Sequence, residues 1–382
     1  MEYPWAFPSI LLIGQCVEVL PLPSGPPPAM RGPPRFPQTV HRKGSTVSVT
    51  SREVHLVARP VGEPVPTDFA LVETTLPDPG PGQVLVRNEW LSVDPYMRGR
   101  MNDTKSYVPP YRLGEVMEGG AVGTVIASGD DSVPVGATVL HSLGWRDHAL
   151  APAQAVRVID AEAAPAQAYL NALGMIGFTA YVGLTEIAPV REGDVVFISG
   201  AAGAVGSLAG QIARRLGAAK VIGSAGGPEK KRRLVEEFGY DAAIDYREGR
   251  LEEQLAQAAP EGIDVYFDNV GGDHLRAAIA AARDHARFAL CGAISQYNAT
   301  EPVPGPDNLF LAVGKRINLR GFIVGDHSRL MGEYVRRAAG WLADGDLRAE
   351  ETVVDGIDNA VTAFLDMMRG ANTGKMLVRL AR

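Results

Sequence analysis

Within residues 194–216, the types and spacing of the small residues predict a phosphate-binding turn. Gly203 has no Cβ, so the backbone can approach a pyrophosphate there, and Gly206 lets a following helix pack closely on the preceding strand. The free N–H groups and the positive dipole end of that helix would face the anion. Ala201 stands where the first glycine of G-x-G-x-x-G is expected, so the pattern here is A-x-G-x-x-G. The apolar strand before the turn and the helix after it favour dinucleotide binding over an ordinary tight turn.

The residues after the next predicted strand indicate which dinucleotide binds. NAD-selective folds usually place Asp or Glu at the end of this second strand, where it binds the ribose 2′-hydroxyl. Here the strand ends in Ser-Ala-Gly-Gly, residues 224–227, and a basic run, residues 230–233, follows at once. A 2′-phosphate needs cations within reach and no carboxylate that repels it. Glutamates on the same helix leave a solvated charged face as an alternative, but the missing acid favours NADP over NAD.

The composition argues against several other classes of function. The chain has 382 residues, enough for two domains, and its net charge of −7 argues against a nucleic-acid-binding surface. Its two cysteines, Cys16 and Cys291, cannot form a disulfide framework or a four-cysteine zinc site, and its seven histidines lack the spacing of zinc ligands. No apolar run of the sequence approaches the length of a membrane span. We therefore expect a cytoplasmic protein without a metal site and without nucleic-acid or membrane partners.

The first fifty residues differ from the rest of the chain. Residues 1–46 are rich in proline and show no sustained periodicity, and such a segment cannot bury enough surface to offset the entropy lost on ordering. Residues 1–50 are therefore interpreted either as a disordered tail or as an artefact of an upstream start site. The second interpretation is favoured, because ordered-looking sequence starts abruptly at Glu53.

The order of the predicted elements indicates two regions. Residues 51–170 contain short strands separated by Pro and Gly, as in a mostly antiparallel β domain. Residues 171–327 alternate strand and helix, which implies right-handed crossovers and a parallel sheet. Residues 328–382 end in a strand that returns to the first region. The predicted fold class is α/β, with a Rossmann-type nucleotide domain inserted in a mostly β, GroES-like catalytic domain and an active site in the cleft between them.

The chain resembles a known family. It is similar to the zinc-independent medium-chain dehydrogenase/reductases, in the branch of the leukotriene B4 12-hydroxydehydrogenases, prostaglandin reductases and 2-alkenal double-bond reductases. The segments that carry this resemblance cover essentially all of residues 51–382 in order: LSVDPYMRGRM (91–101), MIGFTAYVGL (175–184), SGAAGAVGSLAGQIA (199–213), PEKKRRL (228–234), DAAIDY (241–246), GIDVYFDNVGG (262–272), CGAISQYN (291–298), KRINLRGFIV (315–324) and NTGKMLVRL (372–380). Zinc-dependent relatives carry a Gly-His-Glu stretch and a four-cysteine lobe, whereas the comparable region here, residues 114–125, has no His. The resemblance therefore implies NADPH as cofactor, no metal, and a homodimer joined through the nucleotide-domain sheet edges.

The resemblance also implies a set of cofactor-binding residues. In chain order they are Ala202, Gly203, Ala204, Val205, Gly206, Lys230, Tyr246, Asn269, Cys291, Gly292, Ser295, Tyr297, Phe322, Ile323, Val324 and Asn372. Lys230 and Tyr246 would lie beside the 2′-phosphate and Asn269 near a ribose. Residues 291–297 and 322–324 would wrap the nicotinamide half of the cofactor, and Asn372 would close over that half. The alternatives are a simple turn at Asn269, a solvent-facing aromatic at Tyr246, and a hairpin turn formed by Asn372 and Gly374.

The chemistry that suits such a site is reduction of a C=C bond conjugated to a carbonyl, because without a metal nothing evident would polarise an alcohol. Tyr297 is predicted to aim its hydroxyl at the carbonyl oxygen, where charge develops as an enolate, although a pocket-wall role is the alternative. Tyr96 is predicted to line the substrate pocket, and Cys291 to pack rather than react. The predicted function is NADPH-dependent reduction of α,β-unsaturated aldehydes or ketones, and the alternative is an NADPH quinone oxidoreductase of the same superfamily. Loops such as 102–113 and 298–308 would shape the pocket.

Overall fold

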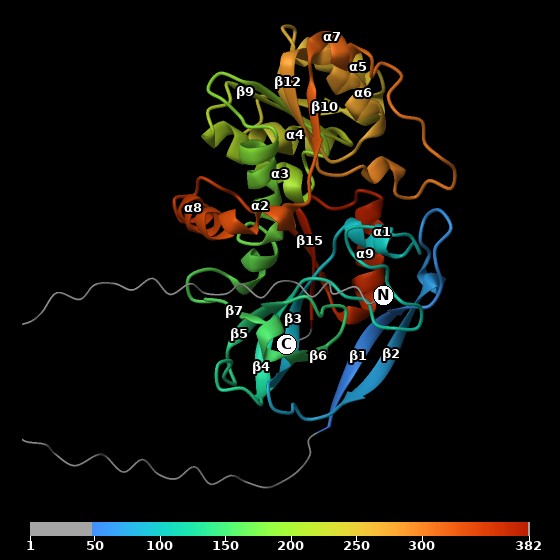
Figure 1. Ribbon diagram of the computed structural model, residues 1–382, viewed down its shortest axis with the longest axis vertical. Coiled ribbons are helices and arrows are strands. Elements are labelled where there is room, and N and C mark those ends of the chain that lie inside the picture. Colours follow the sequence, from blue (N-terminus) through green and yellow to red (C-terminus); the bar gives the residue numbers. More distant parts are fainter. Residues whose placement is uncertain (1–47, 381–382) are drawn as a thin grey trace, which may run out of the picture. The chain divides into compact units, whose positions relative to one another are not determined.

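Two large β-sheets and a separate two-stranded sheet organise residues 48–380, the part of the chain that this computed structural model describes (Figure 1). The prediction for residues 1–50 lies outside the described residues, apart from its last positions. At those positions Val49 and Thr50 belong to the first strand, which begins four residues before the expected Glu53.

The first sheet has six parallel strands in the order β10-β9-β8-β11-β12-β13. Its strands are β8 (Val195–Ile198), β9 (Lys220–Ala225), β10 (Ala242–Asp245), β11 (Ile263–Asp268), β12 (Ala282–Leu290) and β13 (Asn318–Gly321). The connecting helices are α3 (Ala204–Arg215), α4 (Pro228–Glu236), α5 (Leu251–Ala258) and α6 (Gly272–Ala281). This is the strand order of a dinucleotide-binding sheet, in which the direction of winding reverses between β8 and β11. The carboxyl ends of these two strands are therefore where a ligand is expected.

Both faces of this sheet are covered by helices. Val196 and Ile198 belong to an apolar cluster that includes the buried residues of α3. Phe197, which points the other way, belongs to a second cluster with residues of α5 and α6. A strand that is buried on both sides needs no polar alternation, and this explains the unbroken run Val-Val-Phe-Ile of β8.

The second sheet is mostly antiparallel, in the order β14-β15-β3-β4-β5-β7, with β6 paired to β3. The strands of this region are β1 (Val49–Leu56), β2 (Phe69–Leu76), β3 (Gln83–Ser92), β4 (Ala121–Ser128), β5 (Thr138–His141), β6 (His148–Pro152), β7 (Arg157–Val158), β14 (Glu351–Asp355) and β15 (Lys375–Arg379). Strands β1 and β2 form a separate pair. The late strand β15 pairs with the early strand β3, while β14 is parallel to β15. The predicted fold class is confirmed, and the domain boundaries near residues 170 and 327 remain predictions.

Some elements differ from their sequence-based bounds. Strand β12 begins at Ala282 rather than at the expected residue 287. Its first residues are polar and irregular, with His285 at φ +63° and a shift in register, so their sequence does not indicate a strand. Helix α3 begins at Ala204 rather than at residue 207, since the phosphate-binding turn itself forms its first turn. The remaining helices are α1 (Tyr96–Arg100), α2 (Met175–Val182), α7 (Leu311–Lys315), α8 (Met331–Ala343) and α9 (Ala360–Met368).

Candidate active site

The turn between β8 and α3 explains why alanine replaces the first glycine of the phosphate motif. The left-handed backbone that this turn needs lies one residue earlier, at Gly200, with φ +59°. Ala201 is fully buried, and a Cβ placed at Gly223 would lie 2.7 Å from its methyl carbon, so glycine on β9 makes room for the alanine. A Cβ at Gly206 would lie only 2.4 Å from the Gly200 carbonyl oxygen. Gly206 is therefore required for the close approach of α3 to the turn.

The start of α3 presents backbone donors. Gly203 is the N-terminal capping residue, and the first bond within the helix runs from the Ser207 N–H to the Gly203 carbonyl at 2.9 Å. By helix geometry, the N–H groups of residues 204–206 therefore point past the helix end. The predicted pyrophosphate-binding residues 202–206 form this turn and the first helical residues, an arrangement that suits an anion.

A segment near the end of the chain lies against the same turn. The Gly374 N–H donates to the Ala202 carbonyl at 2.8 Å. Asn372 is buried, and its Nδ2 donates to the Gly374 carbonyl at 2.7 Å, within its own turn. A Cβ at Gly374 would lie 2.2 Å from the Glu350 carbonyl oxygen, and φ there is +69°. The geometry thus gives Asn372 a structural bond in the turn, and its predicted cofactor contact remains a prediction.

Three polar side chains gather at the loop after β9. A Cβ placed at Gly226 would lie 2.8 Å from the Tyr246 hydroxyl and 2.9 Å from Arg247 Nε. Lys230, on α4, donates from Nζ to the Gly370 carbonyl at 2.7 Å. Burial lowers the pKa of Lys230, and the nearby charge of Arg247 lowers it further. Two cations and a hydroxyl placed so close together suit a doubly charged phosphate.

Two buried groups support this loop. Ser224 Oγ lies 2.9 Å from His274 Nε2, and the His274 ring meets the Tyr246 ring edge to face, with centroids 5.5 Å apart. Burial lowers the pKa of His274, which favours the neutral imidazole. Asp245, at the end of β10, accepts two backbone N–H groups, including that of Gly227 at 2.9 Å. A carboxylate therefore does lie near the end of β9, contrary to the expectation from β9 alone, but it is engaged by the backbone.

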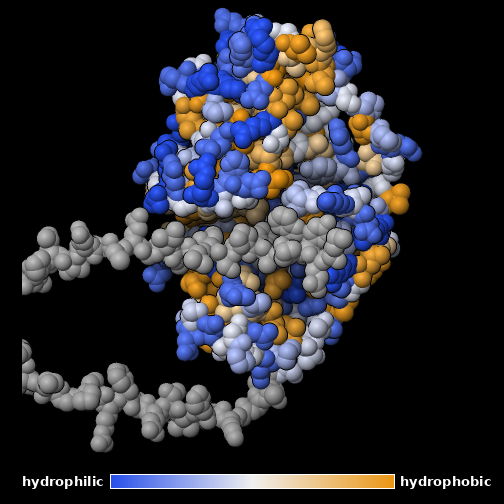
Figure 2. Space-filling view, in the orientation of Figure 1, coloured by the Kyte–Doolittle hydropathy of each residue, from blue (hydrophilic) through white to orange (hydrophobic). Residues whose placement is uncertain are grey.

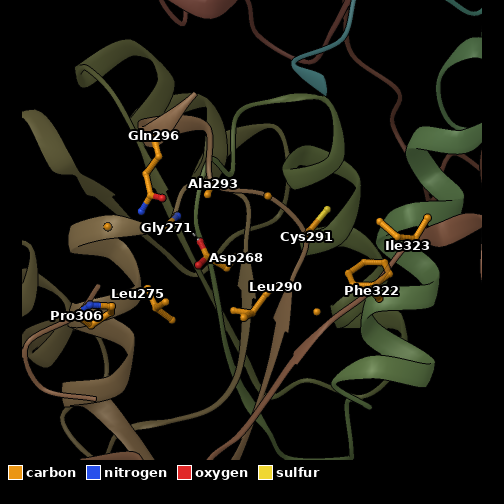
Figure 3. Close-up of a pocket in the computed structure, with 13 residues that line it drawn as sticks. Asp268, Gly271, Leu275, Leu290, Cys291, Ala293, Gln296, Pro306, Phe322 and Ile323 are labelled. Atoms are coloured by element: carbon orange, nitrogen blue, oxygen red, sulfur yellow. Dashed lines mark hydrogen bonds between the residues drawn. The ribbon is translucent and has the colours of Figure 1, made fainter. Parts of the chain in front are cut away.

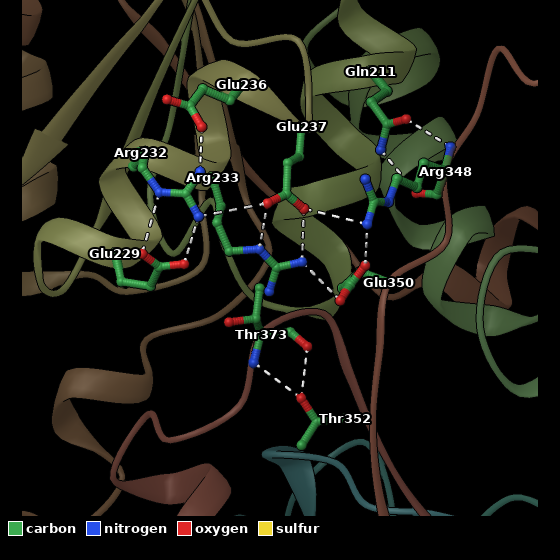
Figure 4. Close-up of polar contacts among 10 residues, drawn as sticks. All are labelled: Gln211, Glu229, Arg232, Arg233, Glu236, Glu237, Arg348, Glu350, Thr352 and Thr373. Carbon is green, nitrogen blue, oxygen red and sulfur yellow. Dashed lines mark hydrogen bonds and ion pairs between the residues drawn. The ribbon is translucent and has the colours of Figure 1, made fainter.

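An ion-pair network joins α4 to the segment before β14 (Figure 4). Arg233 pairs with Glu237 at 2.9 Å and with Glu350 at 2.8 Å. Arg348 pairs with the same two glutamates, at 3.2 Å each. The Gln211 side chain, on α3, accepts from the Arg348 N–H and donates to its carbonyl. This network, named here the phosphate-end network, ties α3 and α4 to the segment that supports Gly374.

A pocket of about 480 Å³ opens at the carboxyl ends of β11 and β12 (Figure 3). It brings together four residues predicted for the nicotinamide half, namely Cys291, Gly292, Phe322 and Ile323. Ser295 and Val324 are not among its lining residues. The Ser295 hydroxyl donates to the Val270 carbonyl at 2.6 Å, so it holds the loop in place.

A buried carboxylate anchors one wall of this pocket. Asp268 accepts the hydroxyls of Ser199, at 3.0 Å, and Tyr266, at 2.7 Å. Asn269 donates from its backbone N–H to the Ser199 hydroxyl and from Nδ2 to the Ser199 carbonyl. Burial, with a smaller effect of the Asp268 carboxylate, raises the pKa of Cys291 to about 12. The thiol therefore stays protonated, as a packing residue would.

One tyrosine hydroxyl lies beside the pocket, although its residue is not among those that line it, and two further tyrosines belong to the first region of the chain. A Cβ at Gly292 would lie 3.2 Å from the hydroxyl of Tyr297, whose pKa is raised mainly by burial. Tyr107, 63% exposed on the 102–113 loop, has its pKa raised by partial burial and then by the charge of Tyr297. Tyr96 opens α1, where burial and then the charge of Asp94 raise its pKa. These groups stay neutral at physiological pH and can donate hydrogen bonds.

Comparison with known proteins decides the family. Residues 52–159 match the model described as the N-terminal domain of oxidoreductase, and residues 204–340 the model described as zinc-binding dehydrogenase. The NADPH-dependent curcumin reductase of Escherichia coli is 41% identical over 332 residues, covering 85% of this chain and 96% of that relative. The NADP(+)-dependent 2-alkenal reductase of Nicotiana tabacum is 38% identical over 341 residues, covering 87% and 98%. The crystal structure of CurA from Vibrio vulnificus in complex with NADPH is 40% identical, with a TM-score of 0.83, covering 87% of this chain and 99% of that one. The chain belongs to the zinc-independent reductases of the medium-chain dehydrogenase/reductase family.

Two further properties of this reductase concern residues 48–380. Within that range, no group of three or more His, Cys, Asp or Glu side chains is placed to hold a metal ion. In the same part of the chain, each helix is too short or too polar to cross a membrane.

Several residues of the reductase site were not found by sequence reasoning. Arg247 directly follows Tyr246, so its basic side chain could have been predicted as a second cation at the 2′-phosphate site. His274 lies in α6 with no local sign that it supports the β9 loop. Tyr107 lies on a loop expected to shape the pocket, but loop sequence does not show which of its side chains interacts electrostatically with Tyr297.

Proposed function

We propose that this reductase reduces the C=C bond of α,β-unsaturated aldehydes and ketones with NADPH. The observation that carries the proposal is that the hydroxyl of Tyr297 lies beside the pocket-lining Gly292, while two cations gather around the β9 loop at another strand end of the same sheet. The activity and cofactor in the names of the curcumin and 2-alkenal reductases support it. The NADPH complex of the Vibrio vulnificus protein supports the cofactor.

The residues present fit NADPH. Backbone donors of residues 204–206 suit the pyrophosphate, and Lys230, Tyr246 and Arg247 suit the 2′-phosphate. Glycine at 206 lets α3 approach the turn closely, and glycine at 226 lets Tyr246 and Arg247 approach the β9 loop. When bound, the cofactor supplies a hydride to the β-carbon of the substrate.

The protein's own residues would act on the carbonyl end of the substrate. The Tyr297 hydroxyl, kept protonated by burial, would donate a hydrogen bond to the carbonyl oxygen as negative charge develops there. Such a preorganised donor stabilises the enolate, and a proton then reaches the α-carbon. Tyr96 and Tyr107 would shape the pocket from the catalytic region.

A cofactor-oxidation assay tests this function. The purified protein is incubated with NADPH and a panel of enals, enones and quinones, and the reduced products are identified by mass spectrometry. Saturated aldehydes and ketones are expected as the main products. Turnover of quinones alone would instead support the quinone oxidoreductase alternative, and no turnover with any member would contradict both functions.

We further propose that the reductase forms a homodimer through the edge of its parallel sheet. Strand β13 ends the sheet, is largely exposed and, among residues 48–380, pairs only with β12. Near it Phe310 is 81% exposed and Val313 is 69% exposed, and Figure 2 shows apolar residues at the top of the view, around α7. Light scattering should give twice the monomer mass, and Phe310→Asp with Val313→Asp should shift it toward the monomer. A monomeric mass for the unmodified protein would contradict the dimer.

A further inference from the structure

Arg98 is a nearly fully buried cation whose three bonds run to three different segments. It lies on α1 with 2% of its surface exposed. Its Nε donates to Asn298 Oδ1 at 2.9 Å, one terminal nitrogen to Asn102 Oδ1 at 2.8 Å, and the other to the Gly62 carbonyl at 2.8 Å. These three partners are neutral, and burial lowers the pKa of Arg98 more than Asp68 raises it. The guanidinium thus bears a burial cost that a purely stabilising residue would avoid.

The three partners flank the candidate active site. Asn298 directly follows Tyr297, and Asn102 opens the loop that carries Tyr107. The third partner, Gly62, also touches the first loop, since a Cβ there would lie 3.5 Å from Thr300. Arg98 therefore holds two loops that each carry a tyrosine. The loop with Tyr297 belongs to the parallel-sheet region, and the loop with Tyr107 belongs to the same region as Arg98. A planar guanidinium can donate in these three directions at once, whereas an ammonium on a flexible stem cannot fix them in a plane.

We infer that Arg98 is a positioning residue that sets the placement of Tyr297 relative to Tyr107, and so determines which substrates the pocket accepts. It acts through Asn298 and Asn102 without itself touching the reacting atoms. The part of this inference that concerns substrates rests on the proposed function. The part that concerns loop placement does not.

The test uses Asn298 rather than Arg98, because truncation of a buried arginine can unfold the protein. Asn298→Ala removes one acceptor, and Asn298→Asp restores an oxygen at the same place. Asn308→Ala is the matched control, since Asn308 lies on the same stretch of chain but donates to the Arg276 carbonyl, away from Arg98. Hydrogen exchange of the full-length protein is followed in peptides that cover residues 102–113 and 292–300.

In Asn298→Ala, exchange should become about tenfold faster in both segments, because loss of a bond to a charged donor loosens both ends. In Asn298→Asp and Asn308→Ala, exchange in residues 102–113 should match the unmodified protein. Faster exchange confined to residues 292–300 in Asn298→Ala, or equal change in the Asn308→Ala control, would overturn the inference.

Activity adds a second readout. For Asn298→Ala, kcat/KM for a bulky enone should fall about tenfold while the Kd for NADPH stays the same, as misplacement of a donor predicts. Asn298→Asp should recover most of that loss, and an equal loss in both variants would overturn the inference. If the unmodified protein fails to reduce any enone, the proposed function fails, and the exchange experiment still decides whether Arg98 links the two loops.

Discussion

The two ends of the candidate cofactor site are held by different kinds of interaction. At the phosphate end, Lys230 and Arg247 lie beside the β9 loop, and the phosphate-end network adds several ion pairs behind them (Figure 4). At the nicotinamide end, Tyr297 is a neutral hydroxyl, and the guanidinium of Arg98 binds only amide and carbonyl oxygens.

This difference predicts that one end determines the affinity for the cofactor and the other end determines the rate of the reaction. Charges at a partly exposed surface attract a phosphate over a distance and tolerate small errors of placement. Neutral hydroxyls in a desolvated site act only when they are placed within hydrogen-bond distance, so they demand a rigid support. Mutations at the first end should therefore change cofactor affinity, and mutations at the second end should change turnover.

The largest expected effect is at the nicotinamide end. Tyr297→Phe should lower kcat for a good enone about 100-fold, because it removes the hydroxyl that donates to the developing oxyanion. Stopped-flow measurement of cofactor oxidation gives the rate, and Tyr169→Phe serves as a control that removes a hydroxyl bonded to the Asp160 carbonyl elsewhere. Full turnover in Tyr297→Phe would assign this residue to the pocket wall.

At the phosphate end, Lys230→Met should raise the Kd for NADPH about 30-fold, since a charge-assisted contact to the 2′-phosphate is lost. The Kd for NADH, which has no such phosphate, should change little. Cofactor fluorescence titration measures both values. Lys231→Met is the control, because the next residue on a helix points about 100° away. An equal loss of affinity for the two cofactors would move Lys230 out of the 2′-phosphate site.

The two ends should also respond differently to pH. The pKa of Lys230 is lowered from 10.5, so its charge is lost as pH rises through a value below 10.5. The pKa of Tyr297 is raised above 10, so most of its hydroxyl stays protonated up to pH 10. Between pH 8 and 10, the KM for NADPH should therefore rise by at most about tenfold per pH unit, and this rise should come before any fall in kcat. Steady-state kinetics across this range would contradict the assignment if kcat fell first, or if Lys230→Met kept the same pH dependence of KM.

The smallest expected effect concerns the phosphate-end network. Glu350→Gln weakens the pairs with Arg233 and Arg348, so it should lower the free energy of unfolding by about 1 kcal/mol or less, and added salt should reduce the difference. Denaturant unfolding at two salt concentrations measures this. Glu229→Gln is the matched control, because its pair with Arg232 stays within α4. If Glu229→Gln lowered the free energy of unfolding as much, the ion pairs to the later segment would contribute no additional stability.

Local features of the site could be predicted from the sequence, and distant contacts could not. The turn before α3 was predicted because strand, glycines and helix follow one another within a short stretch. The basic run that contains Lys230 was predicted from the residues, whereas Tyr246 was predicted only through the family resemblance, and the structure places Tyr246 and Arg247 around Gly226. In contrast, Arg98 meets Asn298 across 200 positions of sequence, and no local periodicity encodes such a pair. The polar start of β12 also escaped prediction, since only its pairing with β11 makes it a strand.

The bond between Gly374 and Ala202 has a consequence for the order in which this protein matures. The phosphate-binding turn emerges from the ribosome about 170 residues before the segment that rests on it. Its own strand and helix can form early, because their contacts are local. The support from Gly374, and the bonds that Lys230 and Arg233 make with Gly370 and Glu350, can form only after residues 350–374 have been synthesised. A nascent chain that has completed its parallel sheet therefore still lacks a finished coenzyme site, and cofactor added during translation should protect the reductase only once these residues have emerged.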